Sequence, residues 1–323
     1  MDIETRTLGK SKLDLTVMGI GLWAIGGTEW GATQDRDSLD TIEAALDAGV
    51  TFFDTADVYG DGHSESLLGR AMQGRRDKFI VASKIGWQNY DHERQTSQYT
   101  TVEKFVSSVE GSLKRLQTDT IDLLQWHIDA RDPTMEIALE GFQRLQRDGK
   151  IRAYGLSTSD FDYLKAFNAG GGCASLQIDY SILNRTPEAK IFPYCQENDI
   201  GIIIRGPLAM GLLTGKFTAD TAFEEGDFRR NWQNNPDENA IFLDDLAKVE
   251  MLKELANGRT LAQLALQFSY THPAVTTTIP GAKTVAQFEE NLKAADLDPL
   301  TAEEMSRIDA ITPPGGGRKI WPA

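Results

Sequence analysis

The sequence predicts an α/β protein built as a closed barrel of parallel strands, because short apolar segments alternate with amphipathic helical patterns along most of its 323 residues. Eight segments have the length and composition of buried strands. They are Val17–Gly21, Thr51–Phe53, Phe79–Ser83, Ile121–Gln125, Ile151–Leu156, Ser175–Ile178, Gly201–Ile204 and Thr276–Ile279. Eight β/α units in one chain favour a (β/α)8 barrel with function at the carboxyl ends of its strands.

An open, doubly wound sheet is the alternative arrangement. It would carry a glycine-rich phosphate-binding turn directly after its first strand. Here the first strand runs into M-G-I-G-L-W (18–23), which lacks the third glycine and leads into no immediate helix. The closed barrel is therefore favoured.

The other elements follow from the local patterns. Residues Thr5 to Val17 alternate polar and apolar side chains around G-K-S, which predicts a β-hairpin ahead of the barrel. Helices are expected between the strands at Arg36–Ala48, Ser64–Gln73, Thr101–Leu116, Thr134–Arg147, Asp160–Phe167, Pro187–Glu197 and Thr284–Ala294. Two further helices are expected at Leu243–Ala256 and Leu261–Tyr270, the second with a capping-box pattern at Thr260 and Gln263.

One connection is too long for an ordinary loop between a strand and a helix. It runs from Gly206 to about Leu243 and holds Phe228, two arginines and Trp232 among glycine and asparagine. This composition indicates a mobile lid over a ligand, with a disordered excursion as the alternative. The tail, residues 312–323, is too rich in glycine and proline for a regular element. We expect a single domain over residues 1–323.

Composition excludes several classes of partner. A net charge of −15 argues against nucleic acid and against an anionic membrane surface. The two cysteines, Cys173 and Cys195, form no metal-binding spacing and no disulfide framework, so no metal is expected. The N-terminus lacks a signal-peptide pattern, and no apolar run approaches the roughly 20 residues of a membrane span. These features predict a soluble, cytoplasmic protein whose oligomeric state is open.

Polar side chains follow three neighbouring strands of the predicted barrel. Asp54 and Tyr59 come after the second strand, Lys84 after the third and His127 after the fourth. Each of the four also has an explanation without function. The carboxylate can form a turn and the phenol ring can cover an edge of the core, while the amine can be solvated and the imidazole can be hydrogen-bonded within the core. In a barrel, however, all four would emerge on one rim, which favours a joint function.

These four groups suit the protonation of a carbonyl oxygen. An isolated tyrosine has a pKa near about 10, too high for efficient acid catalysis around neutrality. A nearby Lys84 ammonium should lower the pKa of Tyr59, and Asp54 would hold that ammonium in place. His127 could donate a hydrogen bond to the carbonyl oxygen. Hydride transfer from a nicotinamide requires such a proton donor.

The sequence resembles the aldo-keto reductase family over nearly its whole length. The motifs are F-D-T-A-D-V-Y-G, G-H-S-E, V-A-S-K, L-L-Q-W-H, G-L-S-T, L-A-M-G-L-L-T-G-K and I-P-G-A-K-T-V-A-Q-F-E-E-N, in the family's order. The resemblance implies a TIM barrel closed at its base by the N-terminal hairpin, with NADPH or NADP extended across the rim. It points to a bacterial-type member related to the branch that contains channel β-subunits. Asp54, Tyr59, Lys84 and His127 resemble the family's catalytic tetrad, with Tyr59 as the acid.

Cofactor residues follow from the same motifs. By resemblance they are Trp23, Asp54, Ser157, Thr158, Gln177, Arg205, Gly206, Pro207, Leu208, Met210, Lys216, Arg229, Gly281, Lys283, Gln287, Glu290 and Asn291. At the far end, P-G-A-K-T opens a helix, whose free amides and dipole favour an anion. Lys283 adds a positive charge for a 2′-phosphate, so NADPH is favoured over NADH.

Two residues depart from the family pattern. Arg205 stands where an aromatic residue often stacks on the nicotinamide; a planar guanidinium can also stack, but its charge should disfavour the oxidised ring. Thr158 stands where many members carry asparagine or arginine.

The substrate is predicted only as a small carbonyl compound, an aldehyde or a ketone. Trp23, Tyr59, Trp87 and His127 are expected to line its site, with Phe228 and Trp232 as a further wall, and Trp126 either lines the site or packs behind His127. Two other functions stay open. One is a cofactor-binding regulatory or scaffold subunit with little turnover, and the other is a phosphate-binding barrel lyase or isomerase.

Overall fold

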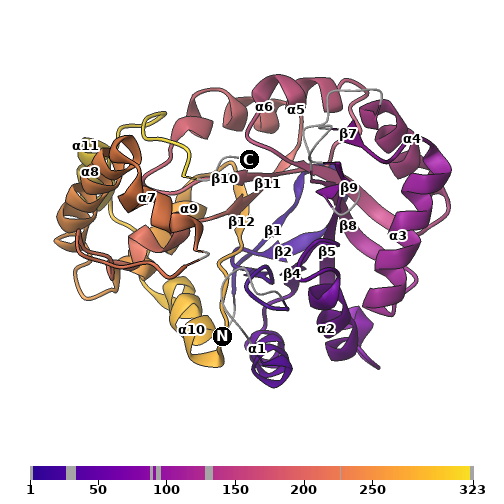
Figure 1. Cartoon of the computed structure of the whole chain (residues 1–323), viewed down its shortest axis with the longest axis horizontal. Helices are drawn as coiled ribbons and strands as arrows, with labels where there is room; N and C mark the ends of the chain where they lie inside the picture. Colours follow the sequence, from indigo (N-terminus) through magenta and orange to yellow (C-terminus); the bar gives the residue numbers. More distant parts are fainter. Residues whose placement is uncertain are drawn as a thin grey trace.

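Eight parallel strands form the centre of the computed structural model (Figure 1). The structure describes residues 3–26, 34–87, 90–91, 96–127, 134–225 and 227–320. Strands that follow each other in the sequence are neighbours in this sheet. In chain order they are β3 (Ile20–Gly21), β4 (Phe52–Asp54), β5 (Ile80–Ile85), β8 (Ile121–Trp126), β9 (Ile151–Ser157), β10 (Ser175–Asp179), β11 (Gly201–Arg205) and β12 (Val275–Thr278). A small antiparallel pair, β6 (Tyr90–Asp91) and β7 (Thr96–Ser97), lies between β5 and β8 in the sequence.

The sheet curls until its first and last strands meet. Parallel bridges join Met18 to Thr278 and Gly21 to Gly281. The amide of Gly19 donates to the carbonyl of Thr278 at 2.9 Å. A Cβ atom at Gly19 would lie 2.9 Å from the carbonyl oxygen of Phe52, so this close approach requires glycine. The expected (β/α)8 barrel is confirmed, and its ring of strands is nearly closed.

The N-terminal hairpin covers one end of the barrel. Its strands β1 (Thr5–Thr7) and β2 (Asp14–Thr16) pair antiparallel. Three buried leucines of the hairpin pack against side chains that point into the barrel, forming one cluster: Leu8, Leu13, Leu15, Phe52, Ala82, Leu123, Ala153, Ala174, Ile203 and Ile279. The amide of Lys10 also donates to the carbonyl of Asp199, just before β11. The hairpin therefore closes the amino-terminal base, as expected.

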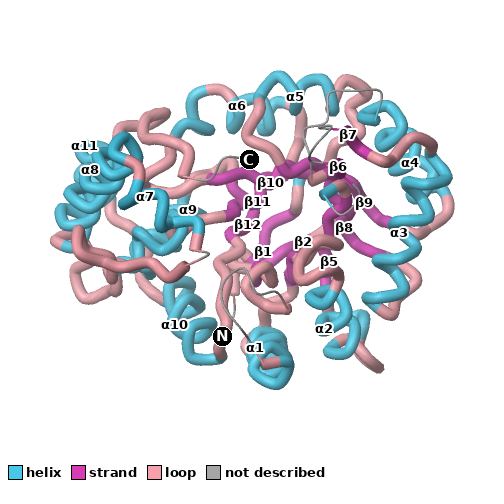
Figure 2. The backbone as a smooth tube through the Cα atoms, viewed as in Figure 1, coloured by secondary structure: helices cyan, strands magenta, loops and turns pink. Residues whose placement is uncertain are grey.

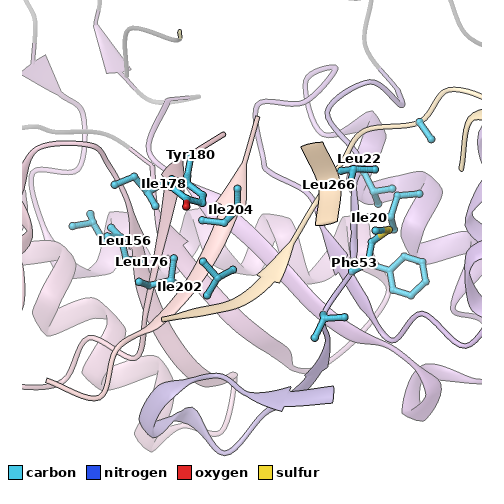
Figure 3. Close-up of a cluster of buried hydrophobic side chains, with 14 of the residues drawn as sticks. Ile20, Leu22, Phe53, Leu156, Leu176, Ile178, Tyr180, Ile202, Ile204 and Leu266 are labelled. Carbon is cyan, nitrogen blue, oxygen red and sulfur yellow. The ribbon is translucent and has the colours of Figure 1, made fainter. Parts of the chain in front are cut away.

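A ring of helices surrounds the barrel (Figure 2). Around most of it run α1 (Asp35–Asp47), α2 (His63–Ala71), α3 (Val102–Leu116), α4 (Thr134–Arg147), α5 (Phe161–Phe167), α6 (Ile191–Glu197) and α10 (Val285–Leu292). The larger core lies between strands and helices, and Figure 3 shows part of it, including Leu176 and Ile178 of β10. Because successive side chains of a strand alternate in direction, Gln177 between them faces the interior of the barrel.

The segment after β11 differs from its prediction. It contains short helices η5 (Ala209–Thr214), η6 (Phe228–Arg230) and α7 (Asn231–Asn234), and then α8 (Pro236–Lys253). Helix α8 was expected only from Leu243. It begins at Pro236 because the side chain of Asn235 accepts hydrogen bonds from the amides of Asp237 and Glu238, with proline in the first helical position.

Helices α9 and α11 follow later in the described part of the chain. Helix α9 (Leu261–Thr271) has the expected capping box of Thr260 and Gln263. Helix α11 (Ala302–Ile311), which was not predicted, has another, formed by Thr301 and Glu304. The pattern predicted as one helix from Pro187 is divided into η4 (Thr186–Ala189) and α6. Among the described segments, none of the helices combines the length and apolarity needed to cross a membrane.

The C-terminal tail is irregular and lies against the barrel. Gly317 bridges to Asn184, and the amide of Ile320 donates to the carboxylate of Asp179 at 3.2 Å. Trp321 lies outside the described residues, as does the side chain of Phe228.

Candidate active site

The carboxyl ends of β4, β5 and β8 bring the four predicted groups together. Asp54 is the last residue of β4, Lys84 belongs to β5, and His127 directly follows β8. The ammonium of Lys84 is paired with the Asp54 carboxylate and donates to the Tyr59 hydroxyl at 3.0 Å and to the Thr55 carbonyl at 2.9 Å. Lys84 and Asp54 are both buried. The structure therefore places Asp54, Tyr59 and Lys84 in direct contact, with the His127 ring 6.0 Å from that of Tyr59.

Two glutamines complete the surroundings of the Asp54 carboxylate. Its Oδ2 accepts from Nε2 of Gln125 at 3.0 Å and from Nε2 of Gln177 at 2.8 Å. A buried carboxylate needs such donors to replace water. Gln177 was expected among the cofactor residues, whereas Gln125 was not predicted. Its signal was a polar residue two positions before His127, directly after the apolar pair Leu123 and Leu124 and next to Lys84 in the strand register.

Aromatic rings surround the phenol. The Tyr59 ring is 6.1 Å from Trp23, nearly parallel, and 6.0 Å from His127, nearly perpendicular; Trp87 lies 6.5 Å beyond His127. Within the described part of the chain, Nδ1 of His127 is buried and has no hydrogen-bond partner. Trp126 is fully buried and donates to Tyr163 at 3.0 Å, so it packs in the core and does not line the site.

The pKa of Tyr59 differs from the expectation. Burial raises the pKa of Tyr59 above its ordinary value, although Lys84 acts to lower it. The expected net lowering of this pKa is therefore wrong, because the lost hydration of the buried phenol outweighs the effect of the ammonium. Burial would also lower the pKa of Lys84, but Asp54 and Tyr59 outweigh it, so that pKa is raised.

The pKa of the His127 imidazole is lowered, in contrast to those of Tyr59 and Lys84. Burial, followed by the positive charges of Lys84 and Arg205, holds the pKa of His127 well below its usual range. At neutral pH the site therefore contains a protonated phenol, a charged ammonium and a neutral imidazole.

A pocket of about 600 Å³ opens beside Tyr59 and extends to the start of α10. The predicted residues that line it are Trp23, Asp54, Tyr59, Trp87, His127, Ser157, Gln177, Arg205, Gly206, Pro207, Leu208, Met210, Arg229, Gly281, Lys283 and Gln287. The lining residues that were not predicted are Gly21, Ala24, Val58, Gly211, Ile279, Pro280 and Ala282. Glycine or apolar side chains carry no sequence signal for a binding surface.

Four predicted cofactor residues lie outside the pocket lining. Thr158 is buried, and its hydroxyl accepts from the amide of Asp160. Lys216 is exposed, two residues after the end of η5. Glu290 accepts from Gln263 at 3.0 Å, and Asn291 donates to the carbonyl of Gly281 at 3.3 Å, which anchors the loop ahead of α10.

The long segment between β11 and α8, called the excursion below, forms part of the pocket rim. Arg229 donates to the carbonyl of Met210 at 3.1 Å and pairs with Asp227 at 2.6 Å. Its guanidinium also lies over the rings of Phe217 and Phe223. Trp232 was expected as a substrate wall, but it is buried within this aromatic cluster and lines no part of the pocket.

The end of the pocket near α10 is cationic. The amide of Lys283 donates to the side chain of Gln287 at 2.9 Å, which fixes the turn into the helix. The Arg229 hydrogen bond is the main cause that lowers the pKa of Asp227, and the charge of Lys283 adds to this effect. Lys283 and Arg229 both line the pocket.

Comparison with known proteins agrees with this geometry. The model of the Aldo/keto reductase family matches residues 17–313. Aldo-keto reductase YhdN of Bacillus subtilis (strain 168) is 35% identical over 316 residues, covering 96% of this chain and 93% of the relative. The NADH-specific methylglyoxal reductase of Escherichia coli (strain K12) is 31% identical over 305 residues, covering 90% and 93%.

Solved structures agree as well. The glycerol dehydrogenase AKR11B4 from Gluconobacter oxydans superimposes with a TM-score of 0.83 at 31% identity, covering 100% of this chain and 99% of that chain. An aldo-keto reductase from Klebsiella pneumoniae in complex with NADPH gives a TM-score of 0.72 at 27% identity, covering 97% and 96%. The chain therefore belongs to the aldo-keto reductase family of oxidoreductases.

Proposed function

We propose that this protein reduces aldehydes and ketones to alcohols with NADPH, and that Tyr59 supplies the proton. The observation that carries the proposal is the 3.0 Å contact between the Tyr59 hydroxyl and the buried Lys84 ammonium, at one end of a large pocket. A bound NADPH would supply the hydride. The protein's own part is to hold the carbonyl, protonate its oxygen and exclude water.

Tyr59 is suited to the proton step by its partners. Its raised pKa keeps the phenol protonated at neutral pH, ready to donate. As the proton leaves, the developing phenolate is stabilised by the fixed charge of Lys84, which is strongest where water is excluded. General acid catalysis of this kind contributes about 10²- to 10⁴-fold in rate. A neutral His127 can donate one hydrogen bond to the same carbonyl oxygen and orient it.

The pocket fits an extended dinucleotide. Ser157, Gln177 and Arg205 would hold the nicotinamide end, and Lys283 and Arg229 the phosphate end. Two cations in the lining of one pocket favour a 2′-phosphate and hence NADPH. The Klebsiella structure in complex with NADPH supports this preference, whereas the E. coli relative is named as NADH-specific. Both nicotinamides therefore need to be compared.

The excursion from Gly206 to Asn235 is the proposed cover of the bound cofactor. Arg229 joins it to the loop after β11 through the carbonyl of Met210. Phe223 and Trp232 of this segment pack against Phe242 of α8, which anchors the segment beside the pocket.

The test is to follow loss of nicotinamide absorbance with NADPH and NADH over a panel of aldehydes and ketones that includes methylglyoxal. We expect turnover with NADPH on several carbonyls and a higher KM with NADH. Tight cofactor binding without turnover on any carbonyl would favour the regulatory-subunit alternative. If neither nucleotide bound or raised Tm, a lyase or isomerase would be favoured.

A further inference from the structure

A second buried carboxylate lies close to the proposed acid in the sequence. Asp57 is two residues before Tyr59, is 2% exposed, and both its carboxylate oxygens are inside the protein. Glu65 of α2, itself fully buried, is the charged group that most opposes its ionisation. Arg115 of α3 is the cation that acts on both carboxylates, but within the described residues its Nε pairs with Glu65 at 2.7 Å and not with Asp57.

Glu65 is firmly held, whereas Asp57 is not. Besides Arg115, the hydroxyl of Ser83 donates to Glu65 at 2.5 Å. The amides of Val58 and Gly86 favour ionisation of Asp57, but among the described residues neither of its carboxylate oxygens has a hydrogen-bond partner. Its charge is therefore only partly compensated.

The position of Asp57 connects two parts of the pocket. Its own amide donates to the carbonyl of Lys84 at 3.0 Å. Val58 precedes Tyr59, and Gly86 precedes Trp87, and both Tyr59 and Trp87 line the pocket. One side chain thus attracts the main chain of the Tyr59 loop and of the turn after β5.

Burying the ionised carboxylate of Asp57 destabilises the folded protein. Burial, with the negative charge of Glu65, raises the pKa of Asp57 to about 7, although Arg115 and the two amides act against the increase. A neutral side chain of the same shape would be easier to bury. A group that opposes folding and lies beside the reacting groups is typical of a residue kept for activity.

We propose that Asp57 is a positioning residue, whose ionised carboxylate attracts the amides of Val58 and Gly86 and so sets the relative placement of Tyr59 and Trp87. The inference rests on the proposed reduction, in which Tyr59 must meet the carbonyl oxygen. Misplacement of a reacting group by a fraction of an ångström to an ångström lowers kcat without removing the group.

The proposal has a specific pH signature. The pKa of Tyr59 and of Lys84 are both raised from ordinary values of about 10, and the pKa of His127 is well below about 6.5. None of these three should titrate near neutrality. A rise of kcat with pH, centred near pH 7, would therefore report ionisation of Asp57.

Stability should change in the opposite direction. The pKa of Asp57 is about 7 in the folded protein, against about 3.9 in an unfolded chain, so the folded state binds this proton more tightly. Its contribution to stability is complete below about pH 4 and is lost as the pH rises to about 7. Activity and Tm should thus follow opposite trends over the same interval.

The test is the variant Asp57→Asn, which has the same shape and no charge. We expect kcat at pH 8 to fall about tenfold and its rise near pH 7 to disappear, while KM and cofactor Kd change little. Tm at pH 8 should increase. The control is Asp122→Asn at the barrel base, where Asp122 pairs with Arg76 and Arg152. It should lower Tm and leave the pH profile of kcat unchanged.

Glu65→Gln provides a second measurement. Removing the carboxylate that opposes ionisation and freeing Arg115 should shift the midpoint of the kcat profile to lower pH. An active wild type whose rate and pH profile are unchanged in Asp57→Asn would overturn this inference alone. A wild type that reduces no carbonyl would overturn the proposed function, and this inference with it.

Discussion

The ammonium of Lys84 lies 3.0 Å from the phenolic oxygen of Tyr59, and both groups are carried by segments that start from neighbouring strands. The same ammonium pairs with Asp54, so a buried positive charge is held in place by a buried negative one. Because Asp54 is in turn bonded to Gln125 and Gln177, Lys84 has little freedom to leave the phenol. Four predictions test this arrangement and the cofactor site beside it.

Replacing Lys84 by methionine should remove both activity and stability. Asp54 would be left as an unpaired buried charge, and breaking a buried pair in this way costs about 3–5 kcal/mol. Denaturant unfolding should detect this loss, and kcat should fall by about 10² or more because the phenolate loses its cation. The double variant Lys84→Met/Asp54→Asn should regain stability without regaining activity. Recovery of activity in the double variant would contradict the role given to Lys84.

Tyr59→Phe should separate chemistry from binding. The ring remains, and only the proton donor is removed, so kcat should fall by about 10²- to 10⁴-fold. The Kd of NADPH, measured by fluorescence titration, should remain close to that of the wild type. Full activity in this variant would show that another group protonates the carbonyl.

Lys283→Ala should discriminate between the two nicotinamides. If Lys283 binds the 2′-phosphate, the variant should lose about 1–3 kcal/mol of NADPH affinity and almost none of NADH affinity. Lys293→Ala is the matched control, since that lysine pairs with Glu290 and lines no part of the pocket. Equal losses for NADPH and NADH in Lys283→Ala would place the phosphate elsewhere.

Arg205 should make the protein prefer reduced cofactor. It lines the pocket next to His127, whose pKa it helps to lower, so its charge acts on the reacting region. A cation there should repel the positive ring of NADP⁺ more than the neutral ring of NADPH. We expect a lower Kd for NADPH than for NADP⁺, and a smaller difference in Arg205→Gln. Tighter binding of NADP⁺ by the wild type would count against this role.

Much of the barrel was predictable because buried parallel strands are continuous apolar runs and their helices carry a clear periodicity. The start of α8 was missed because its cap, Asn235, and Pro236 lie in a polar stretch that resembles a loop. Trp232 was assigned to the pocket on composition alone. Its place in a cluster with Phe223 and Phe242 depends on how the excursion folds back, which no local pattern expresses.

The chain's own order of residues determined the barrel and the identity of the four polar groups at its rim, since strand ends in a parallel barrel must share one face. Only the tertiary structure decided their charge states. Desolvation depends on every segment packed around a group, and it raises the pKa of Tyr59 despite Lys84 and that of Asp57 despite Arg115. Spacing along a sequence shows which groups meet, but the depth at which they are buried is a property of the folded whole.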